Sequence, residues 1–265
     1  MKAEYTNEAV RLLAGAWQIG LLLPELPAHC RPRNAAEAYR IQDLLVEELG
    51  FPVGGWKIGC TGAVARKILK TRRPFAGRIF STRMFESGVG LPDSAYPMRG
   101  LEGEFAFRMK TALPPRKRPY SQAEVTAAVG SLHPAIEIVD SRFEDWLKVG
   151  VQSIIADQGS NGALILGAPV PRWRQLKLER MAVKMVVDGK VVGQGIGADC
   201  LGHPLKALTW LANLLRQRGG LAAGAIVSTG TCSGFHRAAP GVSVRAEFDR
   251  IGAVEVSFGR SALAA

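Results

Sequence analysis

The segment Gly100–Arg108 reads Gly-Leu-Glu-Gly-Glu-Phe-Ala-Phe-Arg, and it decides how the rest of the chain is interpreted. In a β-strand, side chains alternate between the two faces, so Glu102 and Glu104 share one face while apolar residues from Leu101 to Phe107 take the other. Neighbouring like charges repel, and partial burial raises that cost unless a cation or a shared proton neutralises them. The pattern therefore predicts a cation site or, alternatively, two glutamates on the exposed face of a half-buried strand.

A third carboxylate lies in a second apolar strand pattern. The segment Pro134–Asp140 reads Pro-Ala-Ile-Glu-Ile-Val-Asp, which places Glu137 on the face opposite Ile136 and Ile138. Three carboxylates without Cys or His at ligand spacing suit a hard divalent ion, Mg²⁺ or Mn²⁺, better than zinc. The competing interpretation is that all three glutamates are ordinary surface residues.

Length and composition indicate a globular protein. A chain of 265 residues is at the upper edge of what one core supports, so we expect one large domain with a smaller appendage. No apolar run approaches the roughly 18 residues of a membrane span, and the N-terminus lacks the apolar core of a signal peptide, which predicts a cytoplasmic protein. The four cysteines form no Cys-x-x-Cys pair and are expected to be reduced thiols.

The net charge of +11 raises the question of nucleic-acid binding. The basic residues are scattered, and their densest cluster, Arg116–Arg118, follows two prolines in an expected loop. Because no nucleic-acid-binding module accompanies this charge, a small anionic substrate is the favoured partner.

A lysine interrupts a glycine-rich strand pattern at Val53–Gly59, which reads Val-Gly-Gly-Trp-Lys-Ile-Gly. Lys57 stands between Gly55 and Gly59 on one face, and their missing side chains are expected to leave room for a ligand to approach the ammonium group. An exposed lysine on an edge strand is the alternative.

Local signals predict helices first and strands later. Asn34, followed by Glu37, predicts the start of a helix that ends at Gly50, and the pair Asp188-Gly189 predicts a tight hairpin. A short helix is expected over residues 143–149, and a turn of small polar residues that can offer donors to a ligand is expected over residues 154–163. This order favours an α+β fold over a doubly wound sheet.

Six segments taken together carry a resemblance to a known family. In chain order they are Gly55–Gly59, Leu101–Phe105, Pro134–Asp140, Gly189–Pro204, Trp210–Asn213 and Thr229–Thr231. They resemble the fumarylacetoacetate hydrolase superfamily, and within it the branch of 2-keto-4-pentenoate hydratases and 4-oxalocrotonate decarboxylases. The resemblance runs from about residue 10 to the C-terminus.

The resemblance implies both a fold and a site. The fold is a mixed β-roll catalytic domain, residues 73–265, behind a small helical N-terminal region, residues 1–72, that contributes the Lys57 strand. The implied Mg²⁺ or Mn²⁺ ligands are Glu102, Glu104 and Glu137. The implied catalytic residues are Lys57, Asp157 and Ser160, and the implied substrate-binding residues are Leu101, Arg83 and Thr231.

One stretch departs from the family pattern. After Gly77, hydratases of this family often carry acidic residues where this chain has Ser81-Thr82-Arg83. The departure bears on the proton-transfer step of hydration. We hypothesise that Arg83 instead holds a second carboxylate, as a dicarboxylic substrate would require.

The predicted activity is that of a lyase in aromatic catabolism. A hydratase would add water to a 2-hydroxy-2,4-dienoate to give a 4-hydroxy-2-oxo acid; decarboxylation of a 2-oxo-3-enedioate and C–C hydrolysis of an acylpyruvate are the alternatives. Three carboxylates on a dication leave a net charge of −1, which Lys57 can balance when an anionic substrate arrives. A homo-oligomer is expected, as is the capacity to form a complex with a related pathway enzyme. A non-catalytic partner subunit is the competing class.

Overall fold

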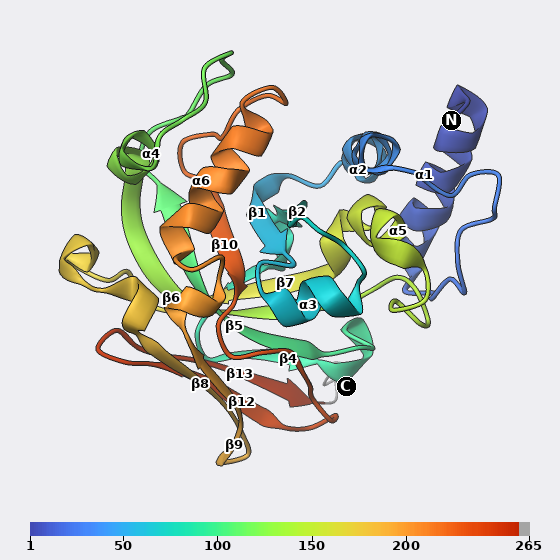
Figure 1. The fold of residues 1–265 in the computed structure, drawn as a ribbon. Coiled ribbons are helices and arrows are strands. Elements are labelled where there is room, and N and C mark those ends of the chain that lie inside the picture. Colours follow the sequence, from blue (N-terminus) through green and yellow to red (C-terminus); the bar gives the residue numbers. More distant parts are fainter. Residues whose placement is uncertain (260–265) are drawn as a thin grey trace.

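Two β-sheets and a helical side make up the computed structural model, which describes residues 1–259 (Figure 1). The larger sheet has the order β2-β1-β10-β5-β6-β7-β3, with β11 paired to β5, and the smaller one has the order β4-β13-β12-β8-β9. The larger sheet contains β1 (Val53–Gly59), β2 (Phe75–Phe80), β3 (Met84–Glu86), β5 (Gly100–Met109), β6 (Val129–Val139), β7 (Asn161–Leu166), β10 (Ile226–Thr231) and β11 (His236–Arg237). The smaller sheet contains β4 (Val89–Pro92), β8 (Ala182–Val187), β9 (Lys190–Ile196), β12 (Ser243–Phe248) and β13 (Gly252–Gly259).

The helices lie on two sides of the larger sheet. In Figure 1, α1, α2 and α5 gather on the side of the N-terminus, while α4 and α6 lie together on the other side. Their bounds are α1 (Ala3–Ile19), α2 (Ala35–Leu49), α3 (Ala63–Ile68), α4 (Gln122–Ala128), α5 (Gly150–Ala156) and α6 (Pro204–Leu215). The mixed parallel and antiparallel strands and the segregated helices confirm the predicted α+β class.

Strand β5 is buried on both faces. Its residues Leu101, Phe105 and Phe107 belong to the main core, and the ring of Phe105 packs edge-on against Phe248 of the smaller sheet at 5.3 Å between centroids. On the other face, Ala106 joins a separate apolar cluster inside the curled larger sheet. The cluster consists of Ile79, Ala106, Ala135, Leu164 and Ile226.

The same alternation places polar side chains beside this apolar cluster. Glu104, Glu137 and Ser228 lie two residues along their strands from Ala106, Ala135 and Ile226, respectively, so they face the same interior. Across neighbouring strands Glu104 pairs with Ala135 and Ser228 with Ala106, so the polar group borders the apolar cluster inside the curled sheet.

Several local predictions are confirmed. The Asn34 side chain accepts a hydrogen bond from the backbone N–H of Glu37, and α2 ends at Gly50 in the left-handed conformation. Asp188 and Gly189 have φ values of 45° and 75° between β8 and β9, as a type I′ hairpin turn requires.

The prediction of a helix over residues 143–149 is wrong. Phe143 forms a β-bridge with Leu23, and the N–H of Glu144 donates to the carbonyl of Leu23, so the segment begins extended and continues as turns over residues 144–148. The helix begins later, at Gly150, and includes Ile154 and the two residues that follow it, which are buried. The polar turn expected over residues 154–163 is also shorter than predicted. The end of this helix and the start of β7 occupy part of it and leave a short 3-10 turn between them.

The N-terminal region is joined to the larger sheet through β1. This strand lies between β2 and β10, so Lys57 belongs structurally to the strands that follow it. A division of the chain at residue 72 stays a prediction. Within residues 1–259, no helix combines the length and apolar character needed to cross a membrane.

Candidate metal and catalytic site

Three carboxylates meet inside the curled sheet. Glu102 on β5 lies directly opposite Glu137 on β6, and Glu104 is two residues further along β5. One oxygen from each side chain lies within 4.8 Å of the others. Glu104 and Glu137 are fully buried and Glu102 is partly buried, so the interpretation as surface glutamates is wrong for the first two.

Hydrogen bonds hold only one oxygen of Glu104. Its Oε2 accepts from the hydroxyl of Ser228 and, at 2.7 Å, from the backbone N–H of Gly230. Its Oε1 is buried and has no hydrogen-bond partner in the described part of the chain. Leaving a buried carboxylate oxygen without a partner is costly, so this atom is suited to a cation.

Glu137 shows the same division between its two oxygens. Its Oε1 lies 3.0 Å from Nζ of Lys57 and accepts from Nδ2 of Asn161 at 3.1 Å. Its Oε2 is buried without a partner among residues 1–259. The free oxygens of Glu104 and Glu137, with the partly exposed Glu102, form a set of hard oxygen donors of the kind that Mg²⁺ and Mn²⁺ prefer.

The site is short of positive charge. Burial raises the pKa of Glu102 to about 7; Lys57 opposes this effect and Glu137 adds to it. Burial, together with Glu137 and Glu102, raises the pKa of Glu104 well above its usual value. Burial alone would lower the pKa of Lys57, but the three carboxylates outweigh it and raise that pKa. One ammonium group therefore does not compensate three carboxylates.

The glycines beside Lys57 serve packing, and the expectation that they open a path to the ammonium group is wrong. A Cβ on Gly55 would lie 2.1 Å from the carbonyl oxygen of Ile226, and one on Gly59 would lie 2.3 Å from the ring of Phe75. The close approach of β10 and of this ring makes Lys57 only 3% exposed, so it is not an edge-strand lysine.

A strained turn covers the ammonium group. Gln158, Gly159 and Ser160 have φ values of 50°, 68° and 56°, three left-handed residues in succession. Lys57 donates to the carbonyl of Gly159 at 3.1 Å. The hydroxyl of Ser160 is buried and has no partner among the described residues, so it is available to a ligand. Strain of this kind persists where the surroundings impose it, often at functional sites.

Asp157 holds this turn in place. Its Oδ1 accepts from Nε1 of Trp17 at 3.0 Å and from Nε of Arg142 at 2.7 Å, while its Oδ2 accepts from the backbone N–H of Arg142. Both oxygens are thus engaged away from the glutamates. The expected catalytic role conflicts with this geometry, and a positioning role fits it.

Two predicted substrate-binding residues lie elsewhere. Leu101 is fully buried on the opposite face of β5, so its side chain is unable to contact a ligand at the carboxylates. Arg83 lies with its guanidinium 5.3 Å from the ring centroid of Tyr96, in a cavity of about 180 Å³ that also contains Asp140 and Gly162. Asp140 follows Glu137 by three residues and so projects from the other face of the sheet. The expected side-chain contacts of these two residues with a ligand at the carboxylates are therefore not supported by the geometry.

Thr231 is placed opposite Glu104 but has another hydrogen-bond partner. Its hydroxyl donates to the carbonyl of Gly234 at 3.0 Å, within the turn after β10. Ser228, Gly230 and Asn161, which contact the glutamates, were not predicted. For Ser228 a signal was present in the sequence. It lies two residues after Ile226, so its side chain points to the same face of β10 as that of Ile226.

Comparison with known proteins assigns the chain to a protein family that has this fold. The sequence profile of the fumarylacetoacetate (FAA) hydrolase C-terminal family matches residues 69–258. The chain belongs to this family, as predicted from its motifs.

Relatives of known name match over most of the chain. A 2-keto-4-pentenoate hydratase of Burkholderia vietnamiensis is 30% identical over 90% of this chain and 92% of its own. A 4-oxalocrotonate decarboxylase of Pseudomonas putida is 31% identical over 84% and 85%, respectively. These relatives confirm the expected branch of the family.

Solved structures confirm the expected fold. The 4-oxalocrotonate decarboxylase of Pseudomonas putida G7, complexed with magnesium and adipate, has a TM-score of 0.89 at 26% identity, covering 97% of this chain and 98% of that one. A fumarylpyruvate hydrolase of Pseudomonas aeruginosa, in complex with Mn²⁺ and pyruvate, shares the fold with a TM-score of 0.62 at 15% identity, covering 80% and 91%.

Proposed function

We propose that this protein is a divalent-metal-dependent hydratase that adds water to a 2-hydroxy-2,4-dienoate and releases a 4-hydroxy-2-oxo acid. Relatives at about 30% identity that are named 2-keto-4-pentenoate hydratase support this reaction. The observation that carries the proposal is a pair of buried oxygens, one on Glu104 and one on Glu137, that lack a hydrogen-bond partner within the described chain and lie beside the ammonium of Lys57.

Glu102, Glu104 and Glu137 would hold the ion. Mg²⁺ or Mn²⁺ bound there would polarise the 2-oxo group of the substrate and stabilise negative charge that develops on it. Ser228 and Asn161 would orient the ligating carboxylates through the oxygens that face away from the ion, a role on which metal affinity depends.

Lys57 would balance the charge of the incoming acid and carry a proton. Its ammonium is already anchored to Glu137 and to the carbonyl of Gly159, so it would stay in place as the substrate enters. The free hydroxyl of Ser160 would donate to the substrate carboxylate or position the attacking water. The ring of Phe75, with its centroid 6.0 Å from Nζ of Lys57, would limit access of bulk water from that side.

Decarboxylation is the second candidate. A relative named 4-oxalocrotonate decarboxylase is 31% identical, and the structure with a TM-score of 0.89 has the same name. Both reactions need negative charge to be stabilised next to a chelated 2-oxo group, so the carboxylate cluster serves either one.

A three-substrate assay tests the proposal. The purified enzyme would be given a 2-hydroxy-2,4-dienoate, an oxalocrotonate-type diacid and an acylpyruvate, each with EDTA and with added Mg²⁺ or Mn²⁺. We expect metal-dependent consumption of the dienoate to exceed that of the other two. Faster turnover of the diacid would favour the decarboxylase, and turnover indifferent to chelation would contradict the metal site.

A further inference from the structure

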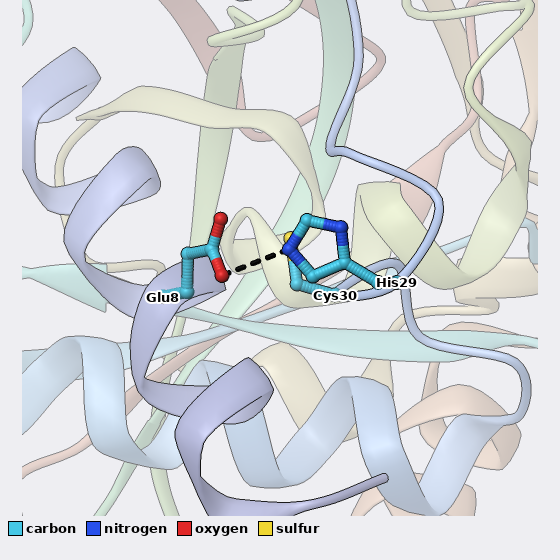
Figure 2. Close-up of side chains that lie close together, drawn as sticks. All are labelled: Glu8, His29 and Cys30. Atoms are coloured by element: carbon cyan, nitrogen blue, oxygen red, sulfur yellow. Dashed lines mark hydrogen bonds and ion pairs between the residues drawn. The ribbon is translucent and has the colours of Figure 1, made fainter.

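We propose that Glu8, His29 and Cys30 form a second metal site, selective for zinc and separate from the carboxylate cluster. One potential ligand atom from each of the three residues lies within 4.8 Å of the others. Figure 2 shows the Glu8 carboxylate and the His29 imidazole facing each other, with the Cys30 sulfur beside them. The distance from Oε2 of Glu8 to Nε2 of His29 is 2.9 Å.

Two separate parts of the chain bring these ligands together. Glu8 lies in the first half of α1, whereas His29 and Cys30 lie in the connection to α2. The ring of Tyr5, one turn before Glu8 on the helix, packs edge-on against the imidazole of His29 at 5.2 Å and fixes its orientation. The side chains are thus already oriented before any ion arrives.

The donor set differs in kind from that of the carboxylate cluster. A thiolate and an imidazole select Zn²⁺ over Mg²⁺, which prefers oxygen ligands. Cys30 is fully buried, and among residues 1–259 its sulfur has a single hydrogen-bond partner, the carbonyl of Pro27 at 3.5 Å. Three protein ligands would leave a fourth, tetrahedral position for water, which the exposed side of His29 admits.

The charges at the cluster balance those of a zinc ion. One carboxylate and one thiolate neutralise Zn²⁺ when the imidazole is neutral. Binding would displace the thiol proton of Cys30 to solvent, so that the sulfur–hydrogen bond breaks as the sulfur–zinc bond forms. Basic side chains near the cluster are paired with acids other than Glu8. These pairs are Lys2–Glu4, Arg31–Glu25 and Arg33–Glu37.

A zinc ion here would fasten α1 to the connection that follows it. The same helix carries Trp17, whose indole donates to Asp157 behind the strained turn. The ion would therefore act on the stability of the N-terminal region and leave the reaction at the glutamates unaffected. Nothing in this proposal depends on which reaction the carboxylate cluster performs.

Cobalt titration of the metal-free protein tests the site. Co²⁺ replaces Zn²⁺ in such sites, and a cysteine ligand produces an intense near-ultraviolet thiolate-to-metal absorption that three carboxylates lack. We expect this absorption to appear at one equivalent per chain, to be displaced by Zn²⁺ and to be absent in Cys30→Ser. It should persist in the matched variant Cys60→Ser, because Cys60 lies away from this cluster.

A second variant distinguishes loss of the zinc site from misfolding of the protein. His29 is exposed, so His29→Gln should fold normally, yet we expect its zinc affinity to fall at least about 100-fold, or roughly 2.8 kcal/mol at 1.4 kcal/mol per tenfold change. Metal-dependent turnover should stay unchanged in His29→Gln. The absence of thiolate absorption in the parent protein, or its persistence in Cys30→Ser, would overturn the proposal and leave a simple Glu8–His29 contact.

Discussion

The ammonium group of Lys57 lies 3.0 Å from Oε1 of Glu137, and both side chains are buried inside the curled sheet. Removing one member of a buried pair leaves the other charge uncompensated, which typically costs about 3–5 kcal/mol. In the presence of a chelator we therefore expect Lys57→Met to lower the free energy of unfolding by about that amount. With Mg²⁺ present, we expect the same substitution to abolish turnover.

Added Mg²⁺ should recover part of the stability of Lys57→Met but none of its activity, because the ion replaces the charge and not the proton carrier. Urea unfolding with EDTA and with Mg²⁺ measures both effects. Lys184→Met, the same substitution at an exposed position of β8, is the control and should change little. Equal stability of Lys57→Met and Lys184→Met in EDTA would contradict the pairing.

The raised pKa values of the glutamates predict an unusual pH dependence without metal. The pKa of Glu102 is about 7 in the folded chain against an ordinary 4.5, and that of Glu104 is also raised. Between these values the folded protein binds protons that the unfolded chain does not, so this contribution stabilises the fold as the pH falls from 7 and is lost above 7.

Thermal unfolding in EDTA should therefore occur at a higher temperature at pH 6 than at pH 8. With saturating Mg²⁺ the order should reverse, because protons compete with the ion for the same oxygens. Unfolding temperatures at the two pH values, each with and without the ion, provide the measurement. A metal-free protein that is more stable at pH 8 than at pH 6 would show that burial does not raise the pKa values of the glutamates.

Ser228 should control metal affinity from behind Glu104. Its hydroxyl donates to the oxygen of Glu104 that faces away from the proposed ion. Loss of such a partner typically weakens metal binding about 10–100-fold, and we expect Ser228→Ala to do so in a Mg²⁺ titration of activity. Ser131→Ala removes a hydroxyl that contacts His133 instead, and it should leave the titration unchanged.

Gly77 is required by the strained turn. A Cβ at this position would lie 2.0 Å from the carbonyl oxygen of Gln158, so Gly77→Ala should displace the turn and, with it, Ser160 and the contact to Lys57. We expect turnover to fall at least tenfold, or about 1.4 kcal/mol in the barrier. Gly90→Ala on β4, where a Cβ would lie 3.6 Å from the nearest atom, is the matched control.

Arg83 should not decide between mono- and dicarboxylic substrates. It lines a cavity with Asp140 on the outer face of the sheet, whereas the glutamates face inward. We expect Arg83→Ala to change the ratio of kcat/KM for a monoacid and a diacid by less than about twofold, within the error of such comparisons. A selective loss on the diacid would restore the original hypothesis that Arg83 grips a second carboxylate.

Strand periodicity placed Glu102 and Glu104 on one face of a strand, but the family resemblance was needed to choose a cation site over surface glutamates and to join Glu137 to them. The alternation at Glu102 and Glu104 and the isolated charge at Glu137 mark positions where a polar side chain faces a closed interior. The cap at Asn34 and the turn at Asp188 were also predictable, because their signals are local.

Long-range packing explains what the sequence did not predict. Which residue fills the space beside a glycine depends on a partner strand, so Gly55 and Gly59 were interpreted as openings although Ile226 and Phe75 close them. The hydrogen bonds that Asp157 accepts from Arg142 and Trp17 join segments up to 140 residues apart, and no local sequence pattern reveals them.

The order of strands has a consequence for biosynthesis. The antiparallel pair of strands β5 and β6 carries all three glutamates, but the strand of Lys57 is not its neighbour, because β10 lies between β1 and β5. Residues 226–231 must therefore leave the ribosome before the lysine can settle beside the acids. Until then the nascent chain holds a cluster of acidic groups without its counter-charge, so the site is completed only near the end of translation, and a prematurely terminated chain should lack it altogether.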